Sequence, residues 1–311
     1  EKGLELLSLC LNNWIFIQKS LTNRSKMDKI EIILRKERIN MKIKKLVLGA
    51  LTFVSVFALA ACGSSSNENL QEKVVKKGKL VVAISPDYAP FEFKALVNGK
   101  DTIVGADVEL AKAIADELGV KLELSSMSFD NVLSSLQTGK ADIAISGLSA
   151  TKERKNAYDF SDPYYETENA ILVKSSNLDK FASIDSLANQ KVAVQKGTIE
   201  EGLAKDQLKD SKIVSLTAMG QAINELKSGQ VQAVDLEKPV AEGYLSQNSD
   251  IALAGFALKT SDGDAKAVAM PKGSGKMVKT VNKVIKKLAK DDKYKQYISD
   301  AAKLTANEIE D

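Results

Sequence analysis

Short apolar runs alternate with amphipathic runs through most of this chain, and this alternation constrains its fold more than any other feature. Residues 80–84 are apolar throughout and predict a buried strand, and residues 121–124 predict the next one. Between them, apolar residues recur at the spacing of one helix face: Val108, Ala111, Ala115 and Leu118. We expect Asp107 to cap this helix at its N-terminus and Gly119 to end it.

The same unit then repeats along the chain. We expect Asp130 to cap a second helix, Gly139 to stop it and residues 141–145 to form a strand. Further predicted strands are residues 170–174, 191–194, 213–216, 231–236 and 267–270. Further predicted helices are residues 199–208, 219–226, 239–246 and 278–288, and we interpret the Lys-rich face of the last one as solvated surface. Strands alternating with helices of this length predict α/β sheets, and two such sets predict two lobes.

A secretion signal precedes these units. Lys42 to Lys45 are followed by an uncharged apolar stretch from Leu46 to Phe57 and then by small residues, which is the order of a signal peptide. The stretch is shorter than the roughly 20 residues of a spanning helix, so we predict that residues 41–61 direct export through the Sec pathway. Leu59 to Cys62 resembles the lipobox of bacterial lipoproteins, which implies a lipid on Cys62; an ordinary Ala-rich cleavage site is the alternative.

The segments on either side of the signal peptide show no globular pattern. Lys36 and Glu37 can be encoded by a ribosome-binding sequence ahead of Met41, so we expect residues 1–40 to be untranslated or a non-native extension. Detection of a peptide from this segment by N-terminal mass spectrometry would contradict that. Residues 62–69 are polar and are expected to form a flexible tether.

Composition excludes several classes of function. The formal net charge of +3 comes from the N-terminal end, because residues 1–61 hold 11 of the 44 Lys and Arg but only 5 of the 41 Asp and Glu. The remainder is mildly acidic and has no basic footprint for nucleic acid. The chain has no His and no Cys after Cys62, which excludes thiolate metal sites, a catalytic cysteine and imidazole general-base chemistry. No metal and no cofactor are expected.

Six runs of residues, by their joint order and spacing, resemble the polar amino-acid-binding proteins of ABC importers over about residues 74–297. The runs are Tyr88–Phe93, Gly105–Lys112, Asp142–Ser149, Thr151–Arg154, Asp159–Tyr164 and Val192–Thr198. The resemblance implies an α/β, two-lobed type II periplasmic-binding-protein fold with a two-strand hinge. It also implies an extracytoplasmic receptor that captures a polar L-amino acid by lobe closure and delivers it to the permease subunits of an ABC importer.

The resemblance also implies how the chain is divided. Lobe 1 is expected to comprise residues 70–164 plus 267–311, and lobe 2 residues 169–258, with crossovers at about 165–168 and 259–266 as the hinge. We expect a monomer, held at the cell membrane by the lipid on Cys62 as in Gram-positive lipoproteins.

A free amino acid presents a carboxylate, for which the family match points to Arg154. Its guanidinium can bind a carboxylate through two hydrogen bonds, close to backbone N–H groups at a helix N-terminus. The Ser149 hydroxyl and the Ser146 and Gly147 carbonyls are expected to meet the ligand from the same lobe. The alternative is that residues 152–155 form a solvated charged turn.

The ligand's ammonium group needs an acid, which the second lobe is expected to supply. Glu237 stands where the family usually has Asp, and its extra methylene requires a shifted ligand or loop. Asp235, on the same strand face, is the rival. A surface ion pair with Lys238 is the other interpretation of either acid.

Four further residues complete the predicted site. Tyr88 and Phe129 resemble the aromatic walls that enclose the ligand's aliphatic part, although buried aromatics are more often core residues. Gln195 and Thr198 lie between a strand and a helix, where they can contact the ligand; N-capping by Thr198 is the alternative.

Side-chain specificity and two other functions stay open. Relatives that read cationic side chains tend to carry an acid near the position of Ser85, and here Asp87 is close by, so glutamine, arginine and other polar amino acids all fit. An enzyme similar to the cyclohexadienyl dehydratases, with Glu237 as proton donor, is the first alternative function. A sensor or adhesion lipoprotein is the second.

Overall fold

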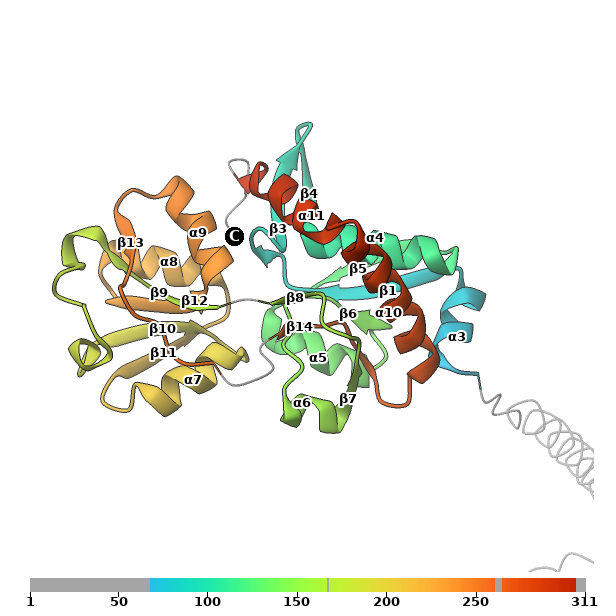
Figure 1. Cartoon of the computed structure of the whole chain (residues 1–311), viewed down its shortest axis with the longest axis horizontal. Helices are drawn as coiled ribbons and strands as arrows, with labels where there is room; N and C mark the ends of the chain where they lie inside the picture. Colours follow the sequence, from blue (N-terminus) through green and yellow to red (C-terminus); the bar gives the residue numbers. More distant parts are fainter. Residues whose placement is uncertain (1–67, 167, 261–264, 306–311) are drawn as a thin grey trace, which may run out of the picture. The chain divides into compact units, whose positions relative to one another are not determined.

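The computed structural model describes residues 68–166, 168–260 and 265–305 (Figure 1). Residues 68–311 form one compact unit. The predictions for the segment 1–40, the signal peptide 41–61 and Cys62 lie outside the described residues. Within the described residues, no helix has the length and the apolar character needed to cross a membrane.

A five-stranded sheet, here the first sheet, has the strand order β5-β1-β6-β15-β7. Its strands are β1 (Lys79–Ile84), β5 (Lys121–Ser126), β6 (Ile143–Ala144), β7 (Tyr158–Phe160) and β15 (Ala269–Pro271). β1 runs parallel to β5 and β6, and β15 runs antiparallel to β6 and β7. β1 is buried because neighbouring strands cover its edges and helices pack on its faces. This burial agrees with the apolar run at 80–84, which predicts a buried strand.

Helices from both ends of the described chain surround the first sheet. They are α3 (Leu70–Lys77), α4 (Ala106–Leu118), α5 (Phe129–Gln137), α6 (Lys152–Ala157), α10 (Gly275–Lys290) and α11 (Lys293–Ala302). The predicted helix at 278–288 lies within α10, and Gly119 ends α4 in a left-handed conformation as predicted. The predicted strand at 141–145 is shorter than expected, and β15 begins two residues later than the predicted 267–270.

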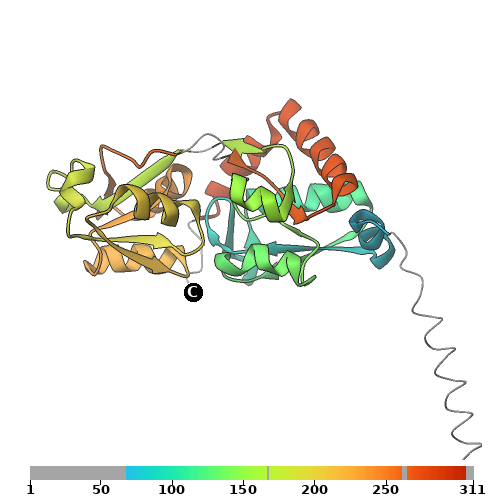
Figure 2. The same ribbon diagram turned by 90° about the horizontal axis from the view of Figure 1, so that it is seen from below.

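A second five-stranded sheet, here the second sheet, has the order β11-β10-β12-β9-β13. Its strands are β9 (Asn169–Lys174), β10 (Lys191–Gln195), β11 (Lys212–Leu216), β12 (Ala233–Glu237) and β13 (Ile251–Leu253). Its helices are α7 (Ile199–Gln207), α8 (Met219–Ser228) and α9 (Lys238–Gln247), with short 3-10 helices at Ser175–Asn177 and Ile184–Leu187. Figure 2 shows helices on both sides of this sheet. The strands and helices predicted between residues 170 and 246 all occur, with bounds that differ by at most two residues.

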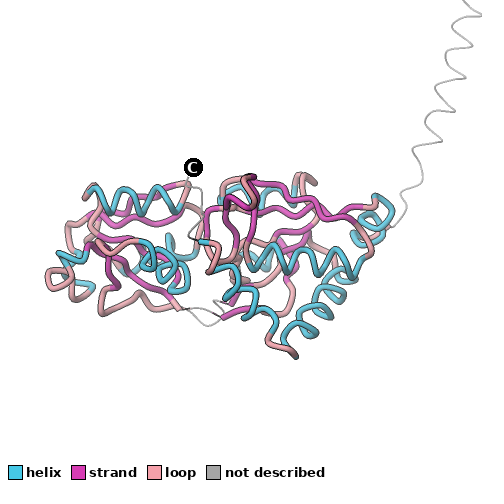
Figure 3. Tube along the Cα trace, turned by 90° about the horizontal axis from the view of Figure 1, so that it is seen from above, coloured by secondary structure: helices cyan, strands magenta, loops and turns pink. Residues whose placement is uncertain are grey.

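A two-stranded sheet joins the first and second sheets. It pairs β8 (Tyr165–Glu166) with β14 (Ala265–Lys266) in antiparallel register. The chain leaves the first sheet through β8 and returns to it through β14, so these strands are the connections between the two larger sheets (Figure 3).

A fourth sheet, with three strands, was not predicted. It consists of β2 (Asp87–Tyr88), β3 (Glu92–Val97) and β4 (Lys100–Val104). Asn98 and Gly99 form the hairpin turn with φ of 51° and 75°. An Asn-Gly pair between strands is a strong hairpin signal, because both central residues of the turn need positive φ, so the sequence contained the information.

The prediction that Asp107 caps α4 is wrong. The helix begins at Ala106, and Asp107 lies inside its first turn without exposed surface. Its carboxylate accepts hydrogen bonds from the Gly147 N–H (2.9 Å) and from the hydroxyls of Tyr164 (2.9 Å) and Tyr294 (2.6 Å). Asp107 therefore joins three segments that are distant in sequence, which local propensity does not reveal.

The prediction that Asp130 caps α5 is also wrong. The cap position is Ser128, and α5 begins at Phe129. The Asp130 carboxylate instead accepts a hydrogen bond from Ser128 Oγ (2.6 Å) and pairs with Lys196 Nζ (2.9 Å), which belongs to the loop after β10. As with Asp107, the carboxylate contacts a residue distant in the sequence and does not cap the helix.

Candidate functional site

One cavity collects residues that follow strands of both larger sheets. The empty space there, including the part open to solvent, is about 270 Å³. Its lining residues are Tyr88, Phe129, Gly147, Ser149, Arg154, Gln195, Thr198, Ile199, Glu200, Glu237 and Lys266. All the residues predicted to bind the ligand belong to this set except Ser146. The fold therefore places the predicted residues around one cavity. Their contact with a ligand stays a prediction.

A larger hollow of about 780 Å³ opens beside Tyr164, Tyr165 and Tyr294. It contains none of the predicted site residues, so its size alone does not make it the site. We therefore take the smaller cavity as the candidate site.

Arg154 is held at the cavity by three segments. Thr151 caps α6 by accepting a hydrogen bond from the Arg154 N–H at 3.2 Å. The guanidinium donates from Nη1 to the Ser149 carbonyl (2.9 Å) and from Nη2 to the Gly197 carbonyl (3.0 Å), and it lies 5.9 Å from the centre of the Phe129 ring. Its neighbours on α6 are exposed, whereas Arg154 is half-buried, so the solvated-turn alternative does not describe it.

Glu237 ends β12 and is 1% exposed. It forms an ion pair with Lys266, which is 2% exposed. Lys266 Nζ also donates a hydrogen bond to Ser149 Oγ at 3.3 Å. The cavity therefore contains a buried cation between the predicted ammonium acceptor and the predicted ligand-binding serine.

The alternatives to Glu237 lie elsewhere. Asp235 has no exposed surface, accepts a hydrogen bond from Asn169 Nδ2 at 3.1 Å and does not line the cavity. Lys238, the predicted surface partner, contacts Glu168 at 3.3 Å.

Lys266 was expected only as the last residue of a hinge crossover, and its place in the cavity was missed. A lysine beside the apolar run 267–270 was the available signal, because Lys is rarely buried unless paired. Burial lowers the pKa of the Lys266 ammonium to about 8; the negative charge of Glu200 opposes this shift and the positive charge of Arg154 adds to it.

Glu200 and Ile199 were also missed. Glu200 lies in the first turn of α7 and is 4% exposed. Its Oε1 is buried and accepts no hydrogen bond from any residue that the structure describes. Both residues follow Thr198 directly, in the first turn of α7, and line the same cavity.

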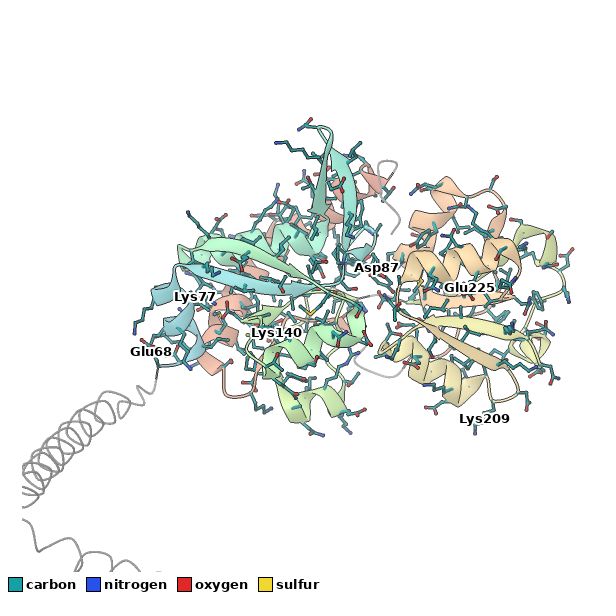
Figure 4. The ribbon with its side chains drawn as sticks, turned by 180° about the vertical axis from the view of Figure 1, so that it is seen from behind. Glu68, Lys77, Asp87, Lys140, Lys209 and Glu225 are labelled. Carbon is teal, nitrogen blue, oxygen red and sulfur yellow. The ribbon has the colours of Figure 1, made fainter. Side chains whose placement is uncertain are left out.

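Thr198 performs the capping role named as its alternative. Its Oγ1 accepts a hydrogen bond from the Glu201 N–H (3.2 Å) and donates to the Gln195 carbonyl (2.8 Å). The Gln195 amide donates to the Asp87 carboxylate at 2.8 Å, and Figure 4 labels Asp87. These contacts position the loop between β10 and α7 at the cavity.

A pair of buried acids supports the loop that carries Gly147. Ser146 Oγ donates to Glu92 Oε1 at 2.7 Å, and the Gly147 N–H donates to Asp107. Burial raises the pKa of Glu92 well above its ordinary value, and the negative charge of Asp107 raises it further. Burial also raises the pKa of Asp107. The Ser146 side chain thus faces Glu92, and Ser146 is not among the residues that line the cavity; contact of its carbonyl with a ligand stays a prediction.

Comparison with known proteins gives a family match over most of the described residues. The sequence pattern of the bacterial extracellular solute-binding proteins, family 3, matches residues 80–300. The arginine-binding extracellular protein ArtP of Bacillus subtilis (strain 168) is 34% identical over 250 residues, which cover 79% of this chain and 93% of ArtP.

Two solved structures extend the comparison. An amino acid ABC transporter substrate-binding protein from Streptococcus pneumoniae Canada MDR_19A, bound to L-arginine, is 51% identical with a TM-score of 0.76, covering 78% of this chain and all of that one. The ancestral amino acid-binding protein AncCDT-1, a precursor of cyclohexadienyl dehydratase, is 38% identical with a TM-score of 0.67, covering 74% of this chain and 98% of that one. The predicted type II periplasmic-binding-protein fold is confirmed.

Proposed function

The chain belongs to the bacterial extracellular solute-binding proteins of family 3, and on this premise we propose that it captures L-arginine for the permease of an ABC importer. The observation that carries the proposal is the gathering of opposite charges around one buried cavity. Arg154 lies on α6, between two strands of the first sheet, whereas Glu237 ends β12 of the second sheet and Glu200 lies on α7, which follows β10. We assign the ligand's carboxylate to Arg154 and its α-ammonium group to Glu237 and the Ser149 hydroxyl.

Glu200 favours a ligand with a cationic side chain. A buried carboxylate oxygen without a hydrogen-bond donor is unfavourable, and a guanidinium would supply donors to Glu200 Oε1. Asp87, the acid considered from the sequence, is already engaged by three donors within the protein. These are Ser85 Oγ (2.9 Å), Gln195 Nε2 (2.8 Å) and the Met219 N–H (2.9 Å).

Two further observations support arginine over other polar amino acids. The Tyr88 and Phe129 rings line the cavity and suit a long aliphatic stem. Among the relatives, ArtP is described as arginine-binding and the Streptococcus pneumoniae protein was solved with L-arginine.

Capture would proceed by closure of two lobes, as in other hinge-bending binding proteins. Lobe 1 would comprise residues 70–164 plus 267–311 and lobe 2 residues 169–258, with the hinge at 165–168 and 259–266. Hydrogen bonds that join the two parts, such as that from Arg154 Nη2 to the Gly197 carbonyl, would hold the closed form. A permease would then recognise that form.

The receptor would act outside the cytoplasm as a monomer. The signal peptide at 41–61 would direct its export, and a diacylglycerol on Cys62 would anchor it to the cell membrane. Stable anchoring requires a second membrane-binding group, which an N-terminal acyl chain would provide. Mass spectrometry of the mature N-terminus tests this part, and an unmodified Cys62 would contradict it.

Isothermal titration calorimetry with L-arginine, L-glutamine and L-citrulline tests the ligand assignment. Citrulline has the shape of arginine but no charge on its side chain, so it isolates the contribution of Glu200. We expect L-arginine to bind roughly tenfold to hundredfold more tightly than L-citrulline, the difference typical of hydrogen bonds to charged groups. Glu200→Gln should remove most of this preference.

Asp206→Asn is the matched control, because Asp206 is an exposed acid on the same helix. It should bind both ligands as the wild type does. Equal binding of arginine and citrulline by the wild type would contradict the choice of arginine, and binding of no amino acid would contradict the receptor function.

One observation connects this chain to the dehydratase alternative: the similarity to AncCDT-1, which is described as an amino acid-binding protein and a precursor of cyclohexadienyl dehydratase. Glu237 would then serve as proton donor, but its ion pair with Lys266 suits an ionised carboxylate better than a proton donor. Incubation with prephenate and arogenate tests the alternative, and turnover abolished by Glu237→Gln would establish it.

A further inference from the structure

We propose that Lys266 competes with the ligand's α-ammonium group for Glu237 and Ser149, and so sets the affinity of the receptor. This inference rests on the proposed function. Lys266 Nζ contacts Glu237 and donates to Ser149 Oγ at 3.3 Å, the two groups assigned to the ligand's ammonium. A second ammonium would have to share Glu237 and the Ser149 hydroxyl with the Lys266 ammonium, and the two positive charges would repel each other at this short range.

The position of Lys266 is built into the fold. Lys266 pairs with Tyr165 in the β8–β14 sheet and forms an isolated antiparallel bridge with Ser149. Its carbonyl accepts a hydrogen bond from the Tyr164 N–H at 2.8 Å. The backbone is therefore fixed at the cavity, and only the four-carbon side chain can move.

The charges around Lys266 explain why a ligand can displace it. Glu237, Glu200 and Arg154 line the same cavity as Lys266. L-arginine carries an ammonium, a guanidinium and a carboxylate, so its binding adds one net positive charge to the cavity. Repulsion from Arg154 and from the ligand then drives the Lys266 ammonium to leave Glu237 or to lose its proton, which the pKa of about 8 makes accessible near neutral pH.

Lys266→Met tests the proposal, because methionine keeps the length of the side chain and removes the ammonium. We expect the Kd for L-arginine to fall about tenfold or more, since Glu237 is left without a cation until the ligand provides one. Lys266→Arg retains a cation that does not deprotonate, so its Kd should rise above the wild-type value. Lys238→Met, which removes an exposed lysine near Glu168, should leave the Kd unchanged.

An analogue without the α-amino group, 5-guanidinopentanoic acid, distinguishes competition from a merely structural role. It leaves the Lys266–Glu237 pair in place, so the Met substitution should not tighten its binding and should weaken it. If Lys266→Met tightens the binding of both ligands equally, or weakens the binding of L-arginine, the proposal is wrong. Failure of the wild type to bind L-arginine at all would instead reject the proposed function.

Discussion

The carboxylate of Asp87 accepts a hydrogen bond from Gln195 Nε2 at 2.8 Å, which joins the small three-stranded sheet to the end of β10 in the second sheet. The same carboxylate accepts the Met219 N–H at the start of α8 at 2.9 Å. Asp87, labelled in Figure 4, therefore binds the end of β10 and the start of α8 at once. This relationship assigns it a structural role and separates it from ligand recognition.

Asp87→Ala should reduce the stability of the protein and weaken binding without changing selectivity. Loss of the carboxylate leaves the Gln195 and Met219 donors without their acceptor, which costs about 1–3 kcal/mol of unfolding free energy. Urea denaturation measures the first effect. Calorimetry should show that the ratio of the Kd values for arginine and citrulline stays at its wild-type value; a lost preference would mean that Asp87 reads the side chain.

Arg154→Lys should weaken L-arginine binding by roughly a hundredfold, because an ammonium cannot form the two parallel hydrogen bonds that a guanidinium offers to a carboxylate. Ligand-induced stabilisation measured by thermal unfolding should shrink accordingly. The control is Lys155→Ala, an exposed neighbour on the same helix. Wild-type affinity in the Lys variant would remove Arg154 from the carboxylate site.

Glu92→Gln should flatten the dependence of stability on pH. The pKa of Glu92 is raised well above its ordinary value of 4.5 by burial and by Asp107, so the folded protein keeps the carboxyl protonated while the unfolded chain ionises. The stability contributed by this group is full below pH 4.5 and is lost as the pH rises toward the folded pKa, by up to about 1.4 kcal/mol per pH unit.

Glutamine cannot ionise, and its amide can accept from Ser146 and donate to Asp107. Urea denaturation from about pH 5 to about pH 8 should therefore show the wild type losing stability relative to the variant as the pH rises. Glu123→Gln, at an exposed acid, should follow the wild-type curve. A variant curve parallel to that of the wild type would mean that Glu92 is ionised in the folded protein.

Gly105→Ala should prevent stable folding. Gly105 has a φ of 130°, and a Cβ atom there would lie 2.1 Å from the Phe91 carbonyl oxygen, which is backbone and cannot move aside. Gly78→Ala is the comparison, since its φ of 73° is also left-handed but no atom lies within 4 Å of the added Cβ. Gly78→Ala should cost only about 1 kcal/mol. A soluble Gly105→Ala protein with wild-type thermal stability would contradict this packing.

Local pattern alone was sufficient for most of the regular structure. The apolar run at 80–84 and the helical spacing from Val108 to Leu118 depend on neighbours along the chain, so strands and helices could be read from them with small errors at their ends. Arg154 lies in one of the runs that resemble the family, and Glu237 was placed by the acid that the family usually has there; both line the cavity. The Asn98-Gly99 hairpin could also have been predicted from the sequence, but it was not.

Tertiary structure decided which charged groups meet. Asp107 is 187 residues from Tyr294 and Lys266 is 117 residues from Ser149, and no local periodicity reports contacts at such separations. Propensity favours Asp107 as a helix cap and gives no reason to place Lys266 in a cavity. A buried charge must find its partner wherever the chain brings one, and only the assembled sheets determine where that is.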